Sequence, residues 1–157
     1  DFCLSRGLGD VYKRQSRNEL FTASRGSGTF LNDRRVRVSG RTRYHEALLG
    51  AHWPSAGDPE QGSQRFRQMA EGATGVRRLG ATVLDLAYVA CGRLDGFCGV
   101  GLKPWDLAAG SLMVLEAGGL IADFDGEQGW MDSGNVLAAS PKIFTQMLTS
   151  LNPPSAA

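Results

Sequence analysis

The 157-residue chain carries 17 lysines and arginines against 16 aspartates and glutamates, and this balance gives no global reason to bind nucleic acid or a membrane surface. Hydrophobic residues make up 42% of the chain, but no apolar run approaches the roughly 20 residues of a transmembrane helix. The three cysteines have no framework spacing, which argues against a secreted disulfide scaffold, and we expect a cytoplasmic protein.

Residues 5–15 show neither helical nor strand periodicity, and we expect no fold element there. The segment Ser5–Gln15 also resembles, letter for letter, one translated frame of a sequencing-library adapter. We therefore interpret residues 1–15 as a non-native tail on a truncated gene, with a natural flexible tail as the alternative. The DNA sequence upstream of the Ser16 codon distinguishes the two.

Residues 16–45 are interpreted as the end of a truncated N-terminal sheet domain. Strands are predicted at Glu19–Ala23 and Gly28–Leu31, joined by a glycine-containing hairpin turn. Arginines crowd the second half of this segment, at Arg34, Arg35, Arg37, Arg41 and Arg43. They could form an anion-binding patch, but the pattern favours a solvated loop or edge strand.

Residues 46–151 alternate between strand and helix patterns and are predicted to form a C-terminal α/β domain, followed by a tail at 152–157. Strands are predicted at Ala47–His52, Val76–Leu79, Leu94–Cys98, Leu120–Phe124 and Val136–Ala139. Helices are predicted from Asp58-Pro59 to about Ala70, at Ala81–Cys91, at Leu107–Ala117 and from Ser140-Pro141 to about Leu151. The fold class is therefore α/β, as a layered α/β sandwich.

The most informative carboxylate is Asp106, which follows Trp105 at the start of an apolar helix. Its spacing favours a capping role, in which the carboxylate accepts backbone N–H groups. The alternative is a hard cation held between this carboxylate and a phosphate at the helix N-terminus. The small residues 108–110 let the helix pack closely against a neighbour, which suits a site at its mouth.

A second candidate is the segment Gly80-Ala81-Thr82, which opens the preceding helix. Its backbone N–H groups and one hydroxyl could cradle a phosphate or a hydroxyl group, although Thr82 is an equally good capping residue. Asp85 lies within the same apolar helix and is interpreted as a buried structural acceptor or an interface residue.

The remaining titratable groups give no further site. Glu116 lies roughly 15 Å along the helix from Asp106, too far to form one acid pair. His45 and His52 have no second ligand at metal spacing, which argues against zinc. Solvated turn or edge positions are predicted for Asp95, Asp123, Asp125 and Glu127.

Residues 17–148 resemble the C-terminal half of the inositol monophosphatase family. The resemblance rests on Arg17-Asn-Glu-Leu-Phe-Thr-Ala, on Leu79-Gly-Ala-Thr-Val-Leu-Asp and the residues that follow it to Phe97, on Leu102-Lys-Pro-Trp-Asp-Leu-Ala-Ala-Gly, and on Glu116-Ala-Gly-Gly.

The resemblance implies the C-terminal part of the layered inositol-monophosphatase-like sugar phosphatase fold. It also implies a Mg²⁺-dependent phosphate monoesterase that hydrolyses inositol phosphate or a related sugar or polyol phosphate. By the family pattern, Asp106 is a metal ligand that also contacts a substrate hydroxyl. Gly80, Ala81 and Thr82 would line the sugar pocket, and the family is commonly dimeric.

Two departures from the family pattern bear on function. The Gly-x-x-Glu and Asp-Pro-Ile/Leu-Asp-Gly-Thr segments, which supply the other metal ligands, are absent from the sequence. We expect them upstream of Ser16, and we expect the isolated chain to be inactive and poorly soluble. Gly99 stands where many members carry a glutamate that binds a sugar hydroxyl, so the natural substrate stays open among inositol, other sugar, polyol and histidinol phosphates.

Two alternatives to the phosphatase remain. The nearest branch of the family is bacterial and includes a member that acts on RNA polymerase in antitermination. A non-catalytic regulatory protein that binds RNA polymerase or RNA is therefore one alternative, supported in the sequence only by the arginine-rich segment 34–43. A degenerate pseudoenzyme, supported only by Gly99, is the other. No membrane partner is expected.

Overall fold

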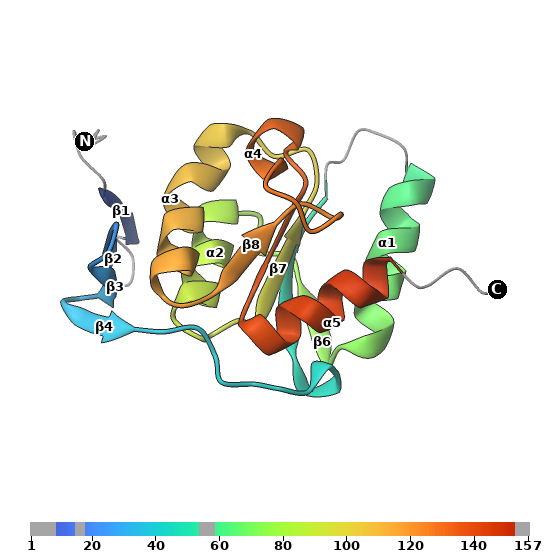
Figure 1. Ribbon diagram of the computed structural model, residues 1–157, viewed down its shortest axis with the longest axis horizontal. Helices are drawn as coiled ribbons and strands as arrows, with labels where there is room; N and C mark the ends of the chain where they lie inside the picture. Colours follow the sequence, from blue (N-terminus) through green and yellow to red (C-terminus); the bar gives the residue numbers. More distant parts are fainter. Residues whose placement is uncertain (1–8, 15–17, 54–58, 153–157) are drawn as a thin grey trace.

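The computed structural model describes residues 9–14, 18–53 and 59–152, which form four layers. A four-stranded sheet lies on one side, followed by helices α2 (Thr82–Ala90) and α3 (Pro104–Glu116), and then by a five-stranded sheet (Figure 1). Helices α1 (Pro59–Gly72) and α5 (Pro141–Leu151) cover the far face of the second sheet. This arrangement confirms the predicted layered α/β sandwich.

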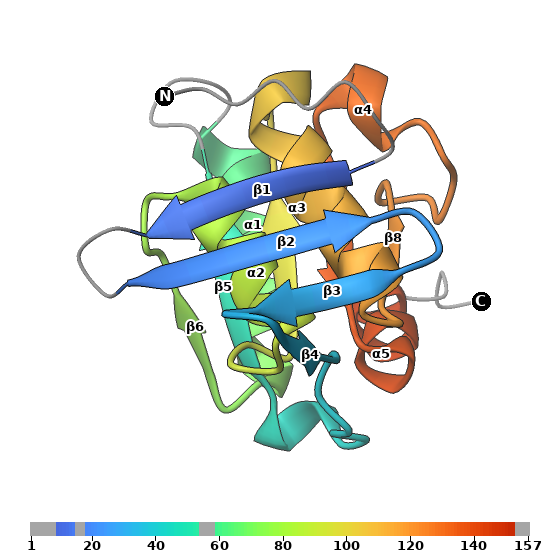
Figure 2. The same cartoon turned by 90° about the vertical axis from the view of Figure 1, so that its left-hand side faces the viewer.

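The first sheet is antiparallel throughout and has the strand order β1-β2-β3-β4. Its face covers α2 and α3 in Figure 2. The predicted hairpin joins β2 to β3, where Gly26 and Gly28 both have positive φ angles that suit glycine. The strands are β1 (Gly9–Arg14), β2 (Glu19–Ser24), β3 (Gly28–Leu31) and β4 (Arg34–Val36).

Strand β1 corrects the expectation that residues 5–15 contain no fold element. Its six residues pair with β2 from Gly9 opposite Ser24 to Arg14 opposite Glu19. An exposed strand edge offers unpaired N–H and C=O groups, so it can pair with a backbone whose side chains show no alternation. The origin of residues 1–15 stays a prediction, and residues 1–8 lie outside the described part of the chain.

The second sheet has the order β6-β5-β7-β9-β8 and is mixed. Strands β6, β5 and β7 are parallel, and β9 runs antiparallel to β7 and β8. Helix α1 connects β5 to β6, and α2 connects β6 to β7, because parallel strands need a crossover connection between them. The strands are β5 (Leu48–His52), β6 (Gly75–Arg77), β7 (Gly96–Gly99), β8 (Leu120–Ala122) and β9 (Val136–Ala139).

The predicted elements are present with shifted ends. Helix α3 begins at Pro104, three residues before the predicted Leu107, because proline is accepted in the first helical turn. Helix α4 (Trp130–Ser133) and the 3₁₀ turn η2 (Tyr44–Glu46) were not predicted, because these elements are too short to show a hydrophobic period in the sequence. Asp58, the expected cap of α1, lies outside the described residues.

Two hydrophobic cores lie on the two faces of the second sheet. The core that faces the first sheet contains Phe21, Leu86, Phe97, Leu107 and Met113, all fully buried. The core under α1 and α5 contains Leu49, Met69, Leu137, Ile143 and Met147. Among the helices that the structure describes, none is long and apolar enough to cross a membrane.

Asp95 was expected in a solvated position, and the structure corrects this: it is only 5% exposed. Its carboxylate accepts hydrogen bonds from Ser39 Oγ at 2.6 Å, Arg41 Nε at 3.1 Å and the Leu48 backbone N–H at 2.8 Å. Ser39 and Arg41 lie on the connection between the two sheets and Leu48 begins β5, so Asp95 holds this connection and β5 to the start of β7. Asp125 and Glu127 are exposed, as predicted.

Candidate functional site

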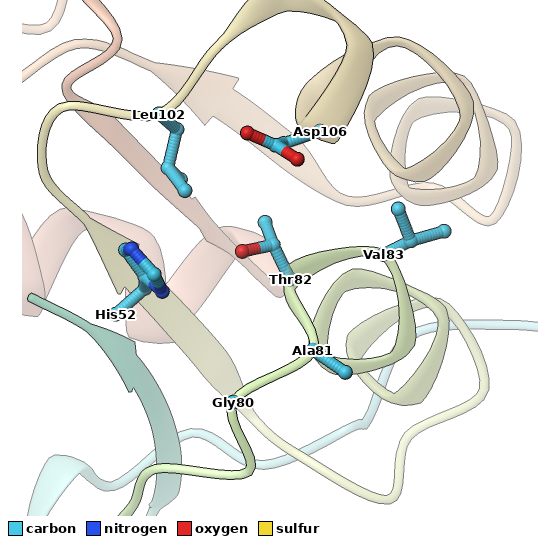
Figure 3. A pocket seen from close by; sticks show the side chains of 7 residues that line it. All are labelled: His52, Gly80, Ala81, Thr82, Val83, Leu102 and Asp106. Atoms are coloured by element: carbon cyan, nitrogen blue, oxygen red, sulfur yellow. The ribbon is translucent and has the colours of Figure 1, made fainter. Parts of the chain in front are cut away.

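A cavity of about 300 Å³ lies at the carboxyl ends of the three parallel strands. Its walls come from the end of β5, the loop between β6 and α2, and the loop between β7 and α3 (Figure 3). Ligands of α/β sheets commonly bind at such carboxyl edges. The lining residues are His52, Gly80, Ala81, Thr82, Val83, Leu102 and Asp106.

The cavity brings together all four residues that the sequence singled out as site candidates. Gly80, Ala81 and Thr82 come from the start of α2, and Asp106 comes from the first turn of α3. The two segments are separated by residues 83–105, so their meeting is a result of the fold. Their roles as substrate and metal groups stay a prediction.

Helices α2 and α3, which lie between the two sheets, both begin at the cavity. The positive ends of α2 and α3 therefore point into the same space, which favours an anion there. Gly110 keeps these helices close, because a Cβ atom at this position would lie 2.5 Å from Leu86 Cβ. The close packing fixes the separation between Thr82 and Asp106.

Asp106 is partly buried, and its carboxylate faces the cavity in Figure 3. One of its oxygens, Oδ2, accepts a hydrogen bond from the Lys103 backbone N–H at 3.1 Å. The capping interaction that the spacing favoured is therefore present, and it orients the side chain at the mouth of α3. This arrangement is compatible with a second contact from the same carboxylate to a ligand.

The described residues do not complete a metal site. Within this part of the chain, no group of three or more His, Cys, Asp or Glu residues could hold a metal ion. Mg²⁺ is usually held by carboxylates together with water and substrate phosphate, and Asp106 supplies one carboxylate. Since Asp106 is the one carboxylate among the described residues that line the cavity, a second carboxylate ligand would come from outside them.

The Gly80–Thr82 segment has the geometry of a helix start. Gly80 has a φ angle of +77°, which favours glycine, and Ala81 is the N-cap residue of α2. Thr82 is the first residue of the helix and its side chain points into the cavity, so it does not take the capping position considered from sequence. Its hydroxyl is therefore a polar group in the cavity wall.

His52 is the cavity residue that sequence reasoning missed. It is partly buried at the end of β5, and burial and the nearby charge of Arg78 lower its pKa from the ordinary 6.5, while Asp106 partly opposes them. The imidazole is therefore neutral at pH 7. The signal in the sequence was its place at the end of the predicted strand Ala47–His52, but the residue was weighed only as a zinc ligand.

Gly99 is closely surrounded. A Cβ atom at this position would collide with the Leu102 side chain and would lie 2.9 Å from the Phe97 ring. The cavity therefore has no room for a glutamate at position 99 while Leu102 keeps its place. The side chains packed around position 99 therefore suit the glycine by which this sequence departs from the family pattern.

Two other carboxylates serve different parts of the molecule. Asp85 is buried, as expected, and its Oδ1 has no hydrogen-bond partner, while burial raises its pKa to about 7. Glu116 lies at the far end of α3 from Asp106, as predicted. Its carboxylate accepts the backbone N–H groups of Gly26 at 2.8 Å and Gly28 at 3.0 Å, which lowers its pKa.

Comparison with known proteins gives the family. A model of the inositol monophosphatase family matches residues 8–153. The chain belongs to this family. The resemblance predicted from the segments around Gly80 and Asp106 is therefore confirmed.

Relatives within the family carry two kinds of name. A putative Nus factor SuhB of Neisseria meningitidis is 46% identical over 134 residues, which cover 84% of this chain and 51% of that protein. An inositol-1-monophosphatase of Mesorhizobium japonicum is 44% identical over 142 residues, which cover 89% of this chain and 53% of that protein. The chain spans about half the length of the curated relatives it matches.

Solved structures of family members share the fold. The crystal structure of the extragenic suppressor protein suhB from Bartonella henselae superposes with a TM-score of 0.91 at 39% identity, covering 94% of this chain and 57% of that one. An inositol monophosphatase from Anabaena superposes with a TM-score of 0.82 at 31% identity, covering 92% of this chain and 62% of that one.

Proposed function

We propose that the protein containing this chain is a Mg²⁺-dependent phosphate monoesterase that acts on inositol phosphate or a related sugar or polyol phosphate. The observation that carries the proposal is the cavity at which α2 and α3 both begin, with Asp106 and the Gly80–Thr82 segment in its wall. Membership of the inositol monophosphatase family supports it.

In this proposal Asp106 and the start of α2 have different roles. Asp106 is a ligand of the metal and contacts a substrate hydroxyl, while the start of α2 offers backbone N–H groups and the Thr82 hydroxyl to the substrate. Bound Mg²⁺ would supply positive charge between carboxylate and phosphate oxygens. Because the described residues provide a single carboxylate here, we expect the isolated chain to have little or no activity.

The test supplies the upstream half, either from the source locus or from the Neisseria meningitidis relative, and measures phosphate release from inositol 1-phosphate with Mg²⁺. Asp106→Asn should lower kcat/KM by about 100-fold or more, because it removes a charge at the metal and substrate. Asp125→Asn, on an exposed turn, is the matched control and should leave the rate unchanged. Full activity of Asp106→Asn, or none in the parent protein, would contradict the proposal.

A second candidate function is that of a non-catalytic regulatory protein bound to RNA polymerase or RNA. Several relatives are named Nus factor SuhB, and Arg34, Arg35 and Arg37 are exposed around β4. Arg41 and Arg43 pair with carboxylates on the protein itself. Salt-sensitive RNA binding that is lost in the triple variant R34A/R35A/R37A would favour this function, and unchanged binding would remove its support.

A homodimer and a cytoplasmic location complete the proposal. Cys91 and Cys98 are free, as in proteins of a reducing compartment. Sedimentation of the restored protein would measure its oligomeric state directly.

A further inference from the structure

The end of β5 carries a polar group that the proposed reaction has not used. His52 is the last residue of β5 and lines the cavity. Figure 3 shows its imidazole facing Thr82 across the cavity, with the Asp106 carboxylate on the same side as Leu102. The side chain therefore borders the space that a substrate would occupy beside Thr82 and Asp106.

His52 also stands directly beside Gly99. The two residues are partners in the parallel register of β5 and β7, and partners on neighbouring strands present their side chains to the same face. Gly99 contributes no side chain, and the packing of Leu102 and Phe97 leaves no room for one. His52 is thus the polar group that this part of the sheet offers to the cavity.

The chemistry of the imidazole differs from that of a carboxylate. A neutral imidazole has one N–H donor and one nitrogen acceptor, which matches a hydroxyl group that both donates and accepts. The charged neighbours of His52 are Arg78, whose guanidinium donates to the Trp53 carbonyl at 2.5 Å, and Asp106. Burial and the charge of Arg78 lower the pKa of His52 and so favour the neutral form of its imidazole.

From this geometry we propose that His52 is a specificity residue that hydrogen-bonds a hydroxyl of the substrate's polyol part. The proposal rests on the proposed phosphatase function and adds, beside Asp106, a second group that contacts a substrate hydroxyl. It places recognition of the hydroxyl on β5, next to the strand position where Gly99 provides no side chain.

The test compares two phosphate esters in the restored protein. Glycerol 2-phosphate has hydroxyls, whereas p-nitrophenyl phosphate has none. His52→Leu should raise KM for glycerol 2-phosphate about five- to tenfold, the value of one hydrogen bond, with little change in kcat. The same variant should leave p-nitrophenyl phosphate unaffected, and His52→Gln, which keeps a donor and an acceptor, should restore most of the loss.

His45→Leu is the matched control, because the His45 side chain is exposed and lies outside the cavity. Equal losses on both esters in His52→Leu would show a structural role and overturn the proposal, as would no change on either. Hydrolysis of p-nitrophenyl phosphate by the parent protein shows separately that the phosphatase function holds.

If the parent protein hydrolyses neither ester, the role of His52 is tested by ligand binding to the full 157-residue chain. The two histidines give two sets of imidazole NMR signals, and His45 serves as the internal reference. A shift of the His52 signals with glycerol 2-phosphate that exceeds the shift with inorganic phosphate supports hydroxyl recognition. Equal shifts with the two additives, or none, would overturn it.

Discussion

At the scale of single residues, Asp85 has the most unusual environment among the described carboxylates. It is 1% exposed within the apolar helix α2, and its Oδ1 has no hydrogen-bond partner. Burial disfavours the charged form and raises its pKa from 3.8 to about 7. The folded protein therefore keeps a proton on Asp85 between these pH values, where the unfolded chain has lost it.

This difference in pKa predicts that the free energy of unfolding depends on pH. Because the folded state binds the extra proton, the contribution of Asp85 to the free energy of unfolding falls as pH rises from about 4 to about 7. Asp85→Asn mimics the protonated form, so its stability relative to the parent chain should grow over this range to a few kcal/mol. Urea unfolding at several pH values measures it, with Asp125→Asn as control. A difference that stays constant with pH would contradict the shifted pKa.

At the scale of elements, the contact between α2 and α3 determines the shape of the cavity, since both helices begin there. Gly110 sits where the helices touch, and an added Cβ would press on Leu86. Alanine normally stabilises a helix interior relative to glycine by about 1 kcal/mol. For glycine to be the better residue here, the free energy gained from close helix packing has to exceed this difference in helix propensity.

We therefore expect Gly110→Ala to destabilise the chain by about 1–2 kcal/mol, as overpacking exceeds the gain in helix propensity. Thermal unfolding measures the change. Gly40→Ala is the matched control, because it makes the same substitution where no atom lies within 4 Å of the added Cβ. A Gly110→Ala variant as stable as the control would show that the helices separate at little cost.

At the scale of the whole molecule, β1 covers one edge of β2 by pairing with it along its full length. Removing residues 1–14 should expose that edge and promote self-association, because unpaired strand edges template pairing with other chains. Removing residues 1–8 keeps β1 and is the matched control. Light scattering of the two truncated chains compares them, and equal association would show that β1 does not protect the edge.

Much of this molecule could be predicted from sequence, because its helices and long strands have strong periods. The Asp106 and Gly80 segments were found through their position at helix starts and through family resemblance. His52 was missed because its importance depends on the register of β5 against β7. Asp95 was placed in solvent because its partners come from a distant connection, and β1 was missed because strand pairing can override a weak pattern.

The packing around Gly99 has a consequence for how such a cavity could change. A glutamate introduced at position 99 meets the end of the Leu102 side chain, so this side chain has to move before a carboxylate can enter. The Phe97 ring lies 2.9 Å from the same added Cβ atom, so it has to give way as well. The three positions are therefore coupled, and the effect of a glutamate at position 99 depends on which residues stand at positions 97 and 102.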